Sequence, residues 1–328
     1  MAGKDQTPAP PRSLDHEALL ALGYTLGDGG YRFITPTPLT HQRVNERAIN
    51  VSAQNLEGVF GWNRPFASGL LPSEQEASLL GSGIIIRHGD QLISTVRWST
   101  LKHLLLLHSS FPTTQEDAVF FGPDTYRFAQ SIERQIEAAQ QPIGRAVDIG
   151  CGSGAGALVI ARACPEAEVL AVDINPKALA FTQVNAQLAG MAKVRAQHSN
   201  ILADVDGCFD LIVANPPYMK DSKQRAYRHG GDALGADLSV RIVHESVERL
   251  SEGGSLVLYT GVAIVDGHDP FIAAVQECLV AGGFQWRYGE LDPDVFGEEL
   301  SEPGYERVDR IAAVELVVTR ALTALAGA

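Results

Sequence analysis

The chain has 328 residues, of which 45% are hydrophobic, and a formal net charge of −13 at pH 7. This length is long for one domain and natural for two, and the hydrophobic content is enough for ordinary cores. Apolar runs such as 104–107 and 255–259 are too short to cross a bilayer, and no charged-then-apolar signal segment opens the chain. We therefore expect a soluble protein of the cytoplasm with no membrane partner.

The negative charge is spread over both halves of the chain. Residues 1–142 hold 11 Lys plus Arg against 14 Asp plus Glu, and the remainder holds 15 against 25. Because a protein that grips a polyphosphate backbone normally presents a basic face, this balance lowers the expectation of a nucleic-acid substrate without excluding it.

Four cysteines, Cys151, Cys164, Cys208 and Cys278, lack the paired spacing that binds metals, and the histidines lack it too. We expect reduced thiols and no metal site.

The N-terminal third begins with a polar, proline-rich tail at residues 1–12. Ser13 is placed to cap a helix over residues 14–22, and Gly23 to end it. A second helix is expected over residues 42–53.

A helix followed by a hairpin is expected next. Ser73 and Glu76 have capping-box spacing at the start of a helix that reaches Leu80. Two β-prone runs, 84–87 and 91–98, flank a turn that contains glycine. This order resembles a winged-helix unit, but the acidic charge favours a small α+β accessory domain without a nucleic-acid role. We assign residues 1–118 to this accessory, substrate-recognition domain.

We assign the remaining residues, 119–328, to a second domain. Asp124 is expected to cap a helix that starts at Thr125 and runs to about residue 140. The preceding loop, 121–124, is either a joint between the domains or a cover over a ligand.

After this helix, β-prone and helical segments alternate. Strands are expected at 146–150, 168–174, 194–198, 209–214, 255–260, 285–291 and 311–319, and helices at 155–163, 176–188, 238–250 and 270–280. Strands separated by crossover helices predict an α/β fold with a doubly wound, seven-stranded and mostly parallel sheet. Since no helix joins the last two strands, one of them is expected to run antiparallel.

A glycine-rich turn follows the first of these strands. Gly150, Gly152 and Gly154 alternate between the strand and the next helix. Glycine lets a ligand lie against the backbone, and the helix N-terminus offers unpaired N–H groups. Dinucleotides and S-adenosylmethionine both suit such a turn; Asp148, before the first glycine, begins to distinguish them.

Further cofactor contacts are expected where the next strands end. Asp173 ends the second strand, where its carboxylate can accept both ribose hydroxyl protons of an adenosine ligand; a plain turn residue is the alternative. Asn200 and Ile201 follow the third strand and are expected beside the adenine.

The fourth strand ends in Asn215-Pro216-Pro217-Tyr218. Two successive prolines fix the backbone and remove N–H donors, so that acceptors remain. The Asn215 side-chain oxygen and the Pro216 carbonyl can both accept hydrogen bonds from one planar NH2 group, and Tyr218 can stack on it. The alternative, a rigid loop with a buried tyrosine, leaves the combination at a strand end unexplained.

Two segments further along are weaker candidates. Tyr227, Arg228 and His229 follow the tetrad and are either substrate contacts or solvated loop residues. The acidic stretch 290–299 is either a solvated surface or a rim that favours a basic or neutral target.

Together these motifs resemble the class I S-adenosylmethionine-dependent methyltransferases over residues 119–320, in the Asn-Pro-Pro-Tyr branch. That branch includes release-factor glutamine N5-methyltransferases and amino-directed adenine and guanine methyltransferases. The resemblance implies a Rossmann-like methyltransferase domain that binds S-adenosylmethionine. It assigns catalysis to the tetrad, Asn215, Pro216, Pro217 and Tyr218. It assigns cofactor contacts to Phe121, Thr125, Asp148, Gly150, Cys151, Gly152, Gly154, Asp173, Ile174, Asn200, Ile201 and Asn215.

The chain departs from the family in two places. Many relatives carry aspartate at the position of Asn200, and residues 1–118 do not match the helical bundle by which the release-factor enzymes select their substrate. The expected function is methyl transfer to a planar amide or amino nitrogen of a protein glutamine or a nucleobase. A small-molecule amine methyltransferase, a nicotinamide oxidoreductase and a non-catalytic binding module are the alternatives.

Overall fold

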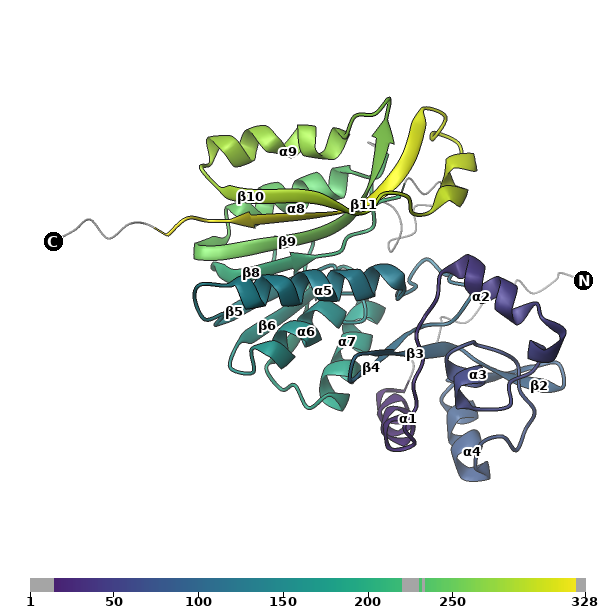
Figure 1. Ribbon diagram of the computed structural model, residues 1–328. Coiled ribbons are helices and arrows are strands. Elements are labelled where there is room, and N and C mark those ends of the chain that lie inside the picture. The colour runs from purple at the N-terminus through teal and green to yellow at the C-terminus, as the bar shows by residue number, and fades with distance from the viewer. Residues whose placement is uncertain (1–14, 220–229, 232–233, 323–328) are drawn as a thin grey trace, which may run out of the picture.

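A seven-stranded sheet forms the centre of the molecule in the computed structural model, which describes residues 15–219, 230–231 and 234–322 (Figure 1). The strands lie in the order β10-β11-β9-β8-β5-β6-β7. They are β5 (Arg145–Ile149), β6 (Glu168–Asp173), β7 (Val194–His198), β8 (Phe209–Ala214), β9 (Leu250–Val265), β10 (Gln285–Asp292) and β11 (Val308–Thr319). The strands from β9 to β7 in this order pair in parallel, and β11 pairs antiparallel with both β9 and β10. The expected doubly wound, mostly parallel sheet is therefore confirmed.

Helices cover both faces of this sheet (Figure 1). One face carries α5 (Pro123–Ala138), α6 (Ala155–Ala163) and α7 (Pro176–Leu188), and the other carries α8 (Asp237–Val247) and α9 (Pro270–Ala281). Successive residues of a strand point to opposite faces, so Ala146 packs in one core and Val147 in the other. The two apolar layers make the central strands hydrophobic on both sides.

Local sequence rules account for where several of these helices start. Asn175 caps α7 by accepting a hydrogen bond from Lys177 N at 3.0 Å, and Asp269 caps α9 through Ile272 N at 3.0 Å. A proline follows each cap, at the helical position whose N–H has no intrahelical partner. The predicted bounds of α6 and α7 agree with the structure.

The N-terminal part is a set of short helices and two hairpins. Its elements are α1 (His16–Asp28), α2 (Pro38–Asn45), η1 (Ala48–Asn50), α3 (Leu56–Phe60), α4 (Ser73–Gly81), β1 (Ile85–His88), β2 (Gln91–Ser94), β3 (Val96–Leu101) and β4 (Leu104–Ser109). The predicted order of α4 and then the β1–β2 hairpin is present. Among the described residues, no helix is long and apolar enough to span a membrane.

The N-terminal part packs on α7 through a shared hydrophobic core. Phe181 and Val184 of α7 belong to the same buried cluster as Trp98 and Leu107. Asn185 of α7 is fully buried and joins the two parts by hydrogen bonds: its Oδ1 accepts from Leu107 N at 2.8 Å, and its Nδ2 donates to Leu107 O at 3.1 Å and to Ser153 O at 2.8 Å. The shared core and these hydrogen bonds thus connect the two predicted domains beside the glycine turn.

The sequence pattern predicted that the first helix ends at Gly23, and this prediction is wrong. Asp15 is the N-cap of α1, which continues to Asp28. A Cβ atom on Gly23 would lie 2.9 Å from Leu188 Cδ2 and 3.0 Å from Trp98 Cη2. Glycine is therefore used at this position for close packing against α7 and not as a stop signal.

Three further local predictions are wrong in the N-terminal part, two of them at helix starts. The helix expected over 42–53 starts earlier, because Thr37 caps it and Pro38 occupies its first turn. The capping box at Ser73 does not form, since Glu76 instead accepts hydrogen bonds from Ser68 Oγ and Gly69 N.

The third concerns the strand expected over 91–98, which is divided into β2 and β3. Ser94 Oγ bonds to both Val96 N and Val96 O, and the chain turns there into a second hairpin with β4. A side chain that bonds to the nearby backbone competes with the hydrogen bonds between strands. The alternating pattern of residues does not reveal this competition.

Replacing Asn185 by Ala is expected to lower the free energy of unfolding by about 2–4 kcal/mol, because the buried backbone groups of Leu107 lose their partners. Urea denaturation measures this change. Gln183→Ala, an exposed amide on the same helix, is the control and is expected to have little effect. Equal losses in both variants would contradict the proposed role of Asn185.

Candidate active site

The carboxyl ends of β5, β6 and β8 meet at one edge of the sheet. Ile149 lies opposite Val172 of β6 and opposite Ala214 of β8. Gly150, Asp173 and Asn215 therefore emerge side by side. They line one cavity with a volume of about 220 Å³.

Most of the residues predicted from the sequence line this cavity. The predicted residues that do so are Thr125, Asp148, Gly150, Cys151, Gly152, Asp173, Ile174, Asn200, Ile201, Asn215, Pro216, Pro217 and Tyr218. Phe121 and Gly154 are not among its lining residues. The cavity thus joins the glycine turn to the Asn-Pro-Pro-Tyr segment, as the sequence suggested.

The glycine turn leaves room for a ligand against the backbone. Gly150 and Gly152 adopt φ values of 67° and 55°, and a Cβ on Gly150 would meet no atom within 4 Å. Such backbone is left-handed, where glycine is strongly preferred. Gly154 serves packing instead, because its Cβ would lie 2.8 Å from Thr182 Cγ2.

Asp173 organises the same turn from the end of β6. Its Oδ2 accepts a hydrogen bond from Gly152 N at 3.0 Å, and its Oδ1 accepts one from Asn175 N at 2.8 Å. Burial raises the pKa of Asp173, and these N–H donors oppose that shift. Each carboxylate oxygen has further lone pairs, which remain able to accept hydroxyl protons.

Asp148 is a second buried carboxyl group in the cavity wall. It is 1% exposed, and its Oδ2 accepts a hydrogen bond from Ala157 N in the first turn of α6 at 2.8 Å. Burial, and to a smaller extent the charge of Asp173, raise the pKa of Asp148 to about 7. The same environment raises the pKa of the Cys151 thiol, so this cysteine is a neutral wall residue.

The wall beyond Asp173 is open and partly apolar. Ile174 is 53% exposed and Asn200 is also exposed, whereas Ile201 is buried with a φ of 55°. Ala178 of α7 lies on this wall as well. A flat heterocycle that follows a ribose on Asp173 would lie against these side chains.

The opposite end of the cavity presents hydrogen-bond acceptors. Asn215 is partly exposed, and among the described residues neither its side chain nor the Pro216 carbonyl takes part in a hydrogen bond. Tyr218 is 9% exposed, and its ring lies edge-on to that of Phe296 with centroids 5.9 Å apart. The hydroxyl of Tyr218 is turned away from a ligand role, because it donates to Asp124 Oδ2 at 2.7 Å.

Two expectations for the segment before α5 need correction. Gly122, not Asp124, is the N-cap of this helix, which starts at Pro123, and Asp124 points into the core as a hydrogen-bond acceptor. Phe121 is fully buried, stacked on His108, and therefore belongs to the core. Its neighbour Phe120 lines the cavity in its place.

Other lining residues were not expected from the sequence. Phe296 lies within the acidic stretch 290–299, and Leu238 and Ile242 belong to α8. In the sequence, the feature that could have indicated Phe296 is that it is an aromatic residue among acidic neighbours. The stretch is tied to the protein by Asp292, which pairs with Arg127, and by Glu290, which pairs with Arg310.

The remaining candidates give no further site in the described part of the chain. Tyr227, Arg228 and His229 lie outside the described residues. No group of three or more His, Cys, Asp or Glu side chains among the described residues could hold a metal ion.

Comparison with known proteins finds relatives for the part of the chain that carries most of this cavity. Residues 134–263 match the methyltransferase small domain family. The release factor glutamine methyltransferase of Deinococcus radiodurans is 32% identical over 57% of this chain and 66% of its own. The ribosomal RNA small subunit methyltransferase C of Shewanella amazonensis is 36% identical over 34% of this chain and 30% of its own. The chain thus spans less than two thirds of either relative.

Among solved structures, the ribosomal protein L11 methylase of Lactobacillus delbrueckii subsp. bulgaricus is 24% identical, covers 61% of this chain and 81% of its own, and has a TM-score of 0.41. Residues 134–263 thus resemble the methyltransferase small domain, and the relatives named above are methyltransferases.

Replacing Asp148 by Asn is expected to change how stability depends on pH. Because the pKa of Asp148 is raised by folding, the folded state keeps a proton that the unfolded state has lost, and stability falls as pH rises toward 7. The neutral variant lacks this loss, so its melting temperature should exceed that of the wild type by a margin that grows from pH 5 to pH 8. If the melting temperatures of the two proteins differ by the same margin at every pH in this range, the burial argument is wrong.

Proposed function

We propose that the protein transfers a methyl group from S-adenosylmethionine to a planar amide or amino nitrogen, of a protein glutamine or of a nucleobase. One observation carries the proposal: the glycine turn with Asp173 and the acceptor pair Asn215 and Pro216 line the same cavity. The glycine turn alone would also suit a dinucleotide, and the proline segment alone would also suit a rigid loop. Together they bring a cofactor and a nitrogen acceptor within reach of one another.

The cofactor half fits S-adenosylmethionine. Gly150 and Gly152 leave the backbone uncovered, Asp173 offers carboxylate oxygens for ribose hydroxyls, and Ile174, Asn200 and Ile201 offer a wall for adenine. The buried carboxyl group of Asp148 suits a ligand that carries positive charge, because a nearby cation stabilises the ionised form.

The acceptor half fits an NH2 group. Two acceptors, the Asn215 side-chain oxygen and the Pro216 carbonyl, can each accept one proton of the same NH2 group and hold the nitrogen in place. Pro216 and Pro217 cannot donate N–H bonds, so this edge favours donors over acceptors in the ligand. Tyr218 provides an aromatic wall for the planar group.

S-adenosylmethionine, when bound, supplies a methyl group on a sulfonium centre that a nitrogen lone pair can attack. The protein orients the attacking nitrogen through Asn215 and Pro216, and most of the rate enhancement is expected from this positioning. The Tyr218 hydroxyl does not act as a base, because burial and the neighbouring Asp124 raise its pKa well above the usual value. The acceptor proton therefore leaves with, or after, methyl transfer.

Two kinds of macromolecule remain as substrates. The names of the relatives point to a release factor glutamine and to ribosomal RNA, and both carry the planar NH2 group that the acceptor edge suits. Incubating the wild-type protein with methyl-labelled cofactor and cell extract, and then separating protein, RNA, DNA and small metabolites, identifies the acceptor class. Label in no fraction would contradict the proposed function.

Replacing Asn215 by Ala is expected to abolish methyl transfer, because one of the two acceptors for the NH2 group is lost. Binding of S-adenosylhomocysteine, measured by calorimetry, should stay nearly unchanged. Gln183→Ala on the outer surface of α7 is the control for both measurements. An equal loss of binding and transfer in the Asn215 variant would refute this division of roles.

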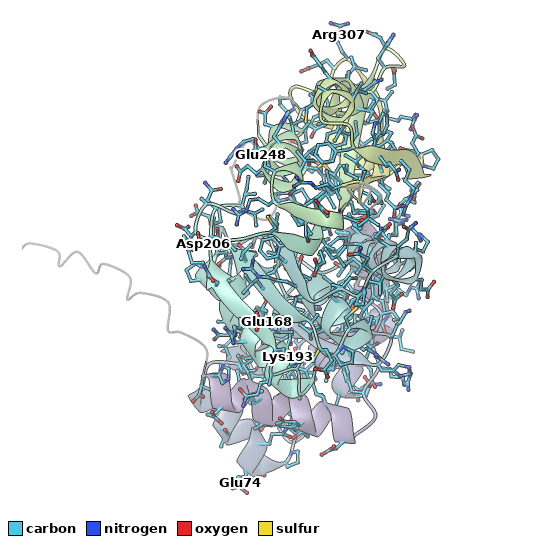
Figure 2. All side chains as sticks on the ribbon, turned by 90° about the vertical axis from the view of Figure 1, so that its left-hand side faces the viewer. Glu74, Glu168, Lys193, Asp206, Glu248 and Arg307 are labelled. Atoms are coloured by element: carbon cyan, nitrogen blue, oxygen red, sulfur yellow. The ribbon has the colours of Figure 1, made fainter. Side chains whose placement is uncertain are left out.

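Replacing Asp173 by Ala is expected to weaken S-adenosylhomocysteine binding roughly 10- to 100-fold, the usual worth of hydrogen bonds to a charged group. Glu168→Ala is the matched control at the other end of β6. Glu168 is the first residue of β6 and Asp173 is the last. Figure 2 shows Glu168 close to Lys193. If both variants bind equally well, the ribose role of Asp173 is wrong.

A nicotinamide cofactor could use the same turn and the same carboxylate. A thermal-shift comparison distinguishes the two cofactors: S-adenosylhomocysteine is expected to raise the melting temperature and NADH to leave it unchanged.

A further inference from the structure

A buried carboxylate lies in the wall of the cavity beside Tyr218. Asp124 is 3% exposed and belongs to the first turn of α5. Its Oδ2 accepts the hydroxyl of Tyr218 at 2.7 Å, and its Oδ1 accepts the hydroxyl of Tyr259 at 2.6 Å. Bonds from hydroxyl groups to an ionised oxygen are short and strong, so this carboxylate holds two tyrosines at once.

The three residues come from three separate elements. Asp124 lies on α5, Tyr259 lies in β9, and Tyr218 follows β8. Tyr259 is fully buried and packs in the core with α5 and α6, which fixes the position of its hydroxyl. The carboxylate therefore ties the last residue of the tetrad to a helix and a strand of the core.

The ring of Tyr218 is confined on its other sides as well. A Cβ on Gly261 would lie 2.3 Å from the ring atoms Cδ2 and Cε2, so the ring lies directly on the backbone of β9. Phe296 meets the ring edge-on. The hydroxyl is bonded to Asp124, so the ring is held at both ends in the wall of the cavity that Asn215 also lines.

The charge of Asp124 is partly balanced from the same helix. Arg127 Nη1 lies 3.3 Å from Asp124 Oδ1, and Arg127 Nη2 lies 2.7 Å from Asp292 Oδ2 at the end of β10. Such pairing offsets part of the cost of burying a carboxylate. The arginine also links the carboxylate to the segment that carries Phe296.

We propose that Asp124 is a positioning residue for the methyl acceptor: it fixes the Tyr218 ring through the tyrosine hydroxyl, with Tyr259 as the second anchor. This inference rests on the proposed function, since it assigns Tyr218 to the acceptor wall. Asp124 acts through Tyr218, because both of its carboxylate oxygens accept tyrosine hydroxyls.

The first test is a double-mutant cycle of Asp124→Asn and Tyr218→Phe. Each single variant is expected to lower kcat about 10- to 100-fold, because the acceptor wall moves while the volume of the side chains is kept. S-adenosylhomocysteine affinity should stay within about twofold. If Asp124 acts through the tyrosine hydroxyl, the double variant is no slower than the slower single variant.

Tyr288→Phe is the matched control. The Tyr288 hydroxyl also donates to a carboxylate, that of Asp269, and does so on the α9 side of the sheet. This variant loses the same kind of hydrogen bond but is expected to keep the wild-type kcat. The proposal is wrong if the loss of kcat in the double variant equals the product of the two single losses. It is also wrong if Tyr288→Phe loses as much kcat as the single variants.

The second test does not depend on methyl transfer. In the NMR spectrum of protein with ring-13C-labelled tyrosine, Asp124→Asn is expected to shift or broaden the Tyr218 and Tyr259 signals and to leave the Tyr288 signal in place. An unchanged Tyr218 signal would refute the positioning role, whether or not the wild type is active. Failure of the proposed function is recognised separately, as a wild-type protein that transfers no methyl group.

Discussion

The parallel pairing of β5 with β6 and β8 is the constraint on which the site depends. Because Ile149 lies opposite both Val172 and Ala214, the residues that follow these strands share one edge. A strand rises about 3.3 Å per residue, so a two-residue slip of β8 would carry Asn215 roughly 7 Å from the glycine turn. The hydrophobic layers on both faces of the sheet hold this register and so determine the geometry of the site.

Three carboxyl groups line the cavity, of which Asp124 and Asp148 are buried and Asp173 is partly buried, and each is held in a different way. Asp173 is bound by backbone N–H groups of the turn, Asp148 lies at the start of α6, and Asp124 is bound by two tyrosine hydroxyls. Buried acids favour cations nearby, which suits the proposed cofactor, since S-adenosylmethionine carries a sulfonium and an ammonium group. The donors to these carboxyl groups differ: backbone N–H groups hold Asp173 and Asp148 at the glycine turn, and tyrosine hydroxyls hold Asp124 near the Asn-Pro-Pro-Tyr segment.

The N-terminal part contributes to the site through packing. Asn185 joins β4, α7 and the glycine turn, and Val119, which lines the cavity, belongs to the N-terminal hydrophobic cluster. The described part of residues 1–118 therefore shares a hydrophobic core with one face of α7. A change in this segment can reach the cofactor end of the cavity through contacts of this kind.

Much of the fold and of the candidate site was readable in the sequence. Alternating strands and helices, Asn175 before Pro176 and three spaced glycines act over a few residues, so local rules suffice for them. The Asn-Pro-Pro-Tyr segment is equally local, because its prolines set their own backbone. Tertiary structure alone decided what depends on distant partners. Asp124 read as a helix cap, yet it binds Tyr218 and Tyr259, which lie 94 and 135 residues away in the chain. Gly23 read as a stop, yet it makes room for Leu188. Spacing in a sequence encodes neighbours within a turn, whereas the partner of a buried acid or of a bare glycine is chosen only when separate elements pack together.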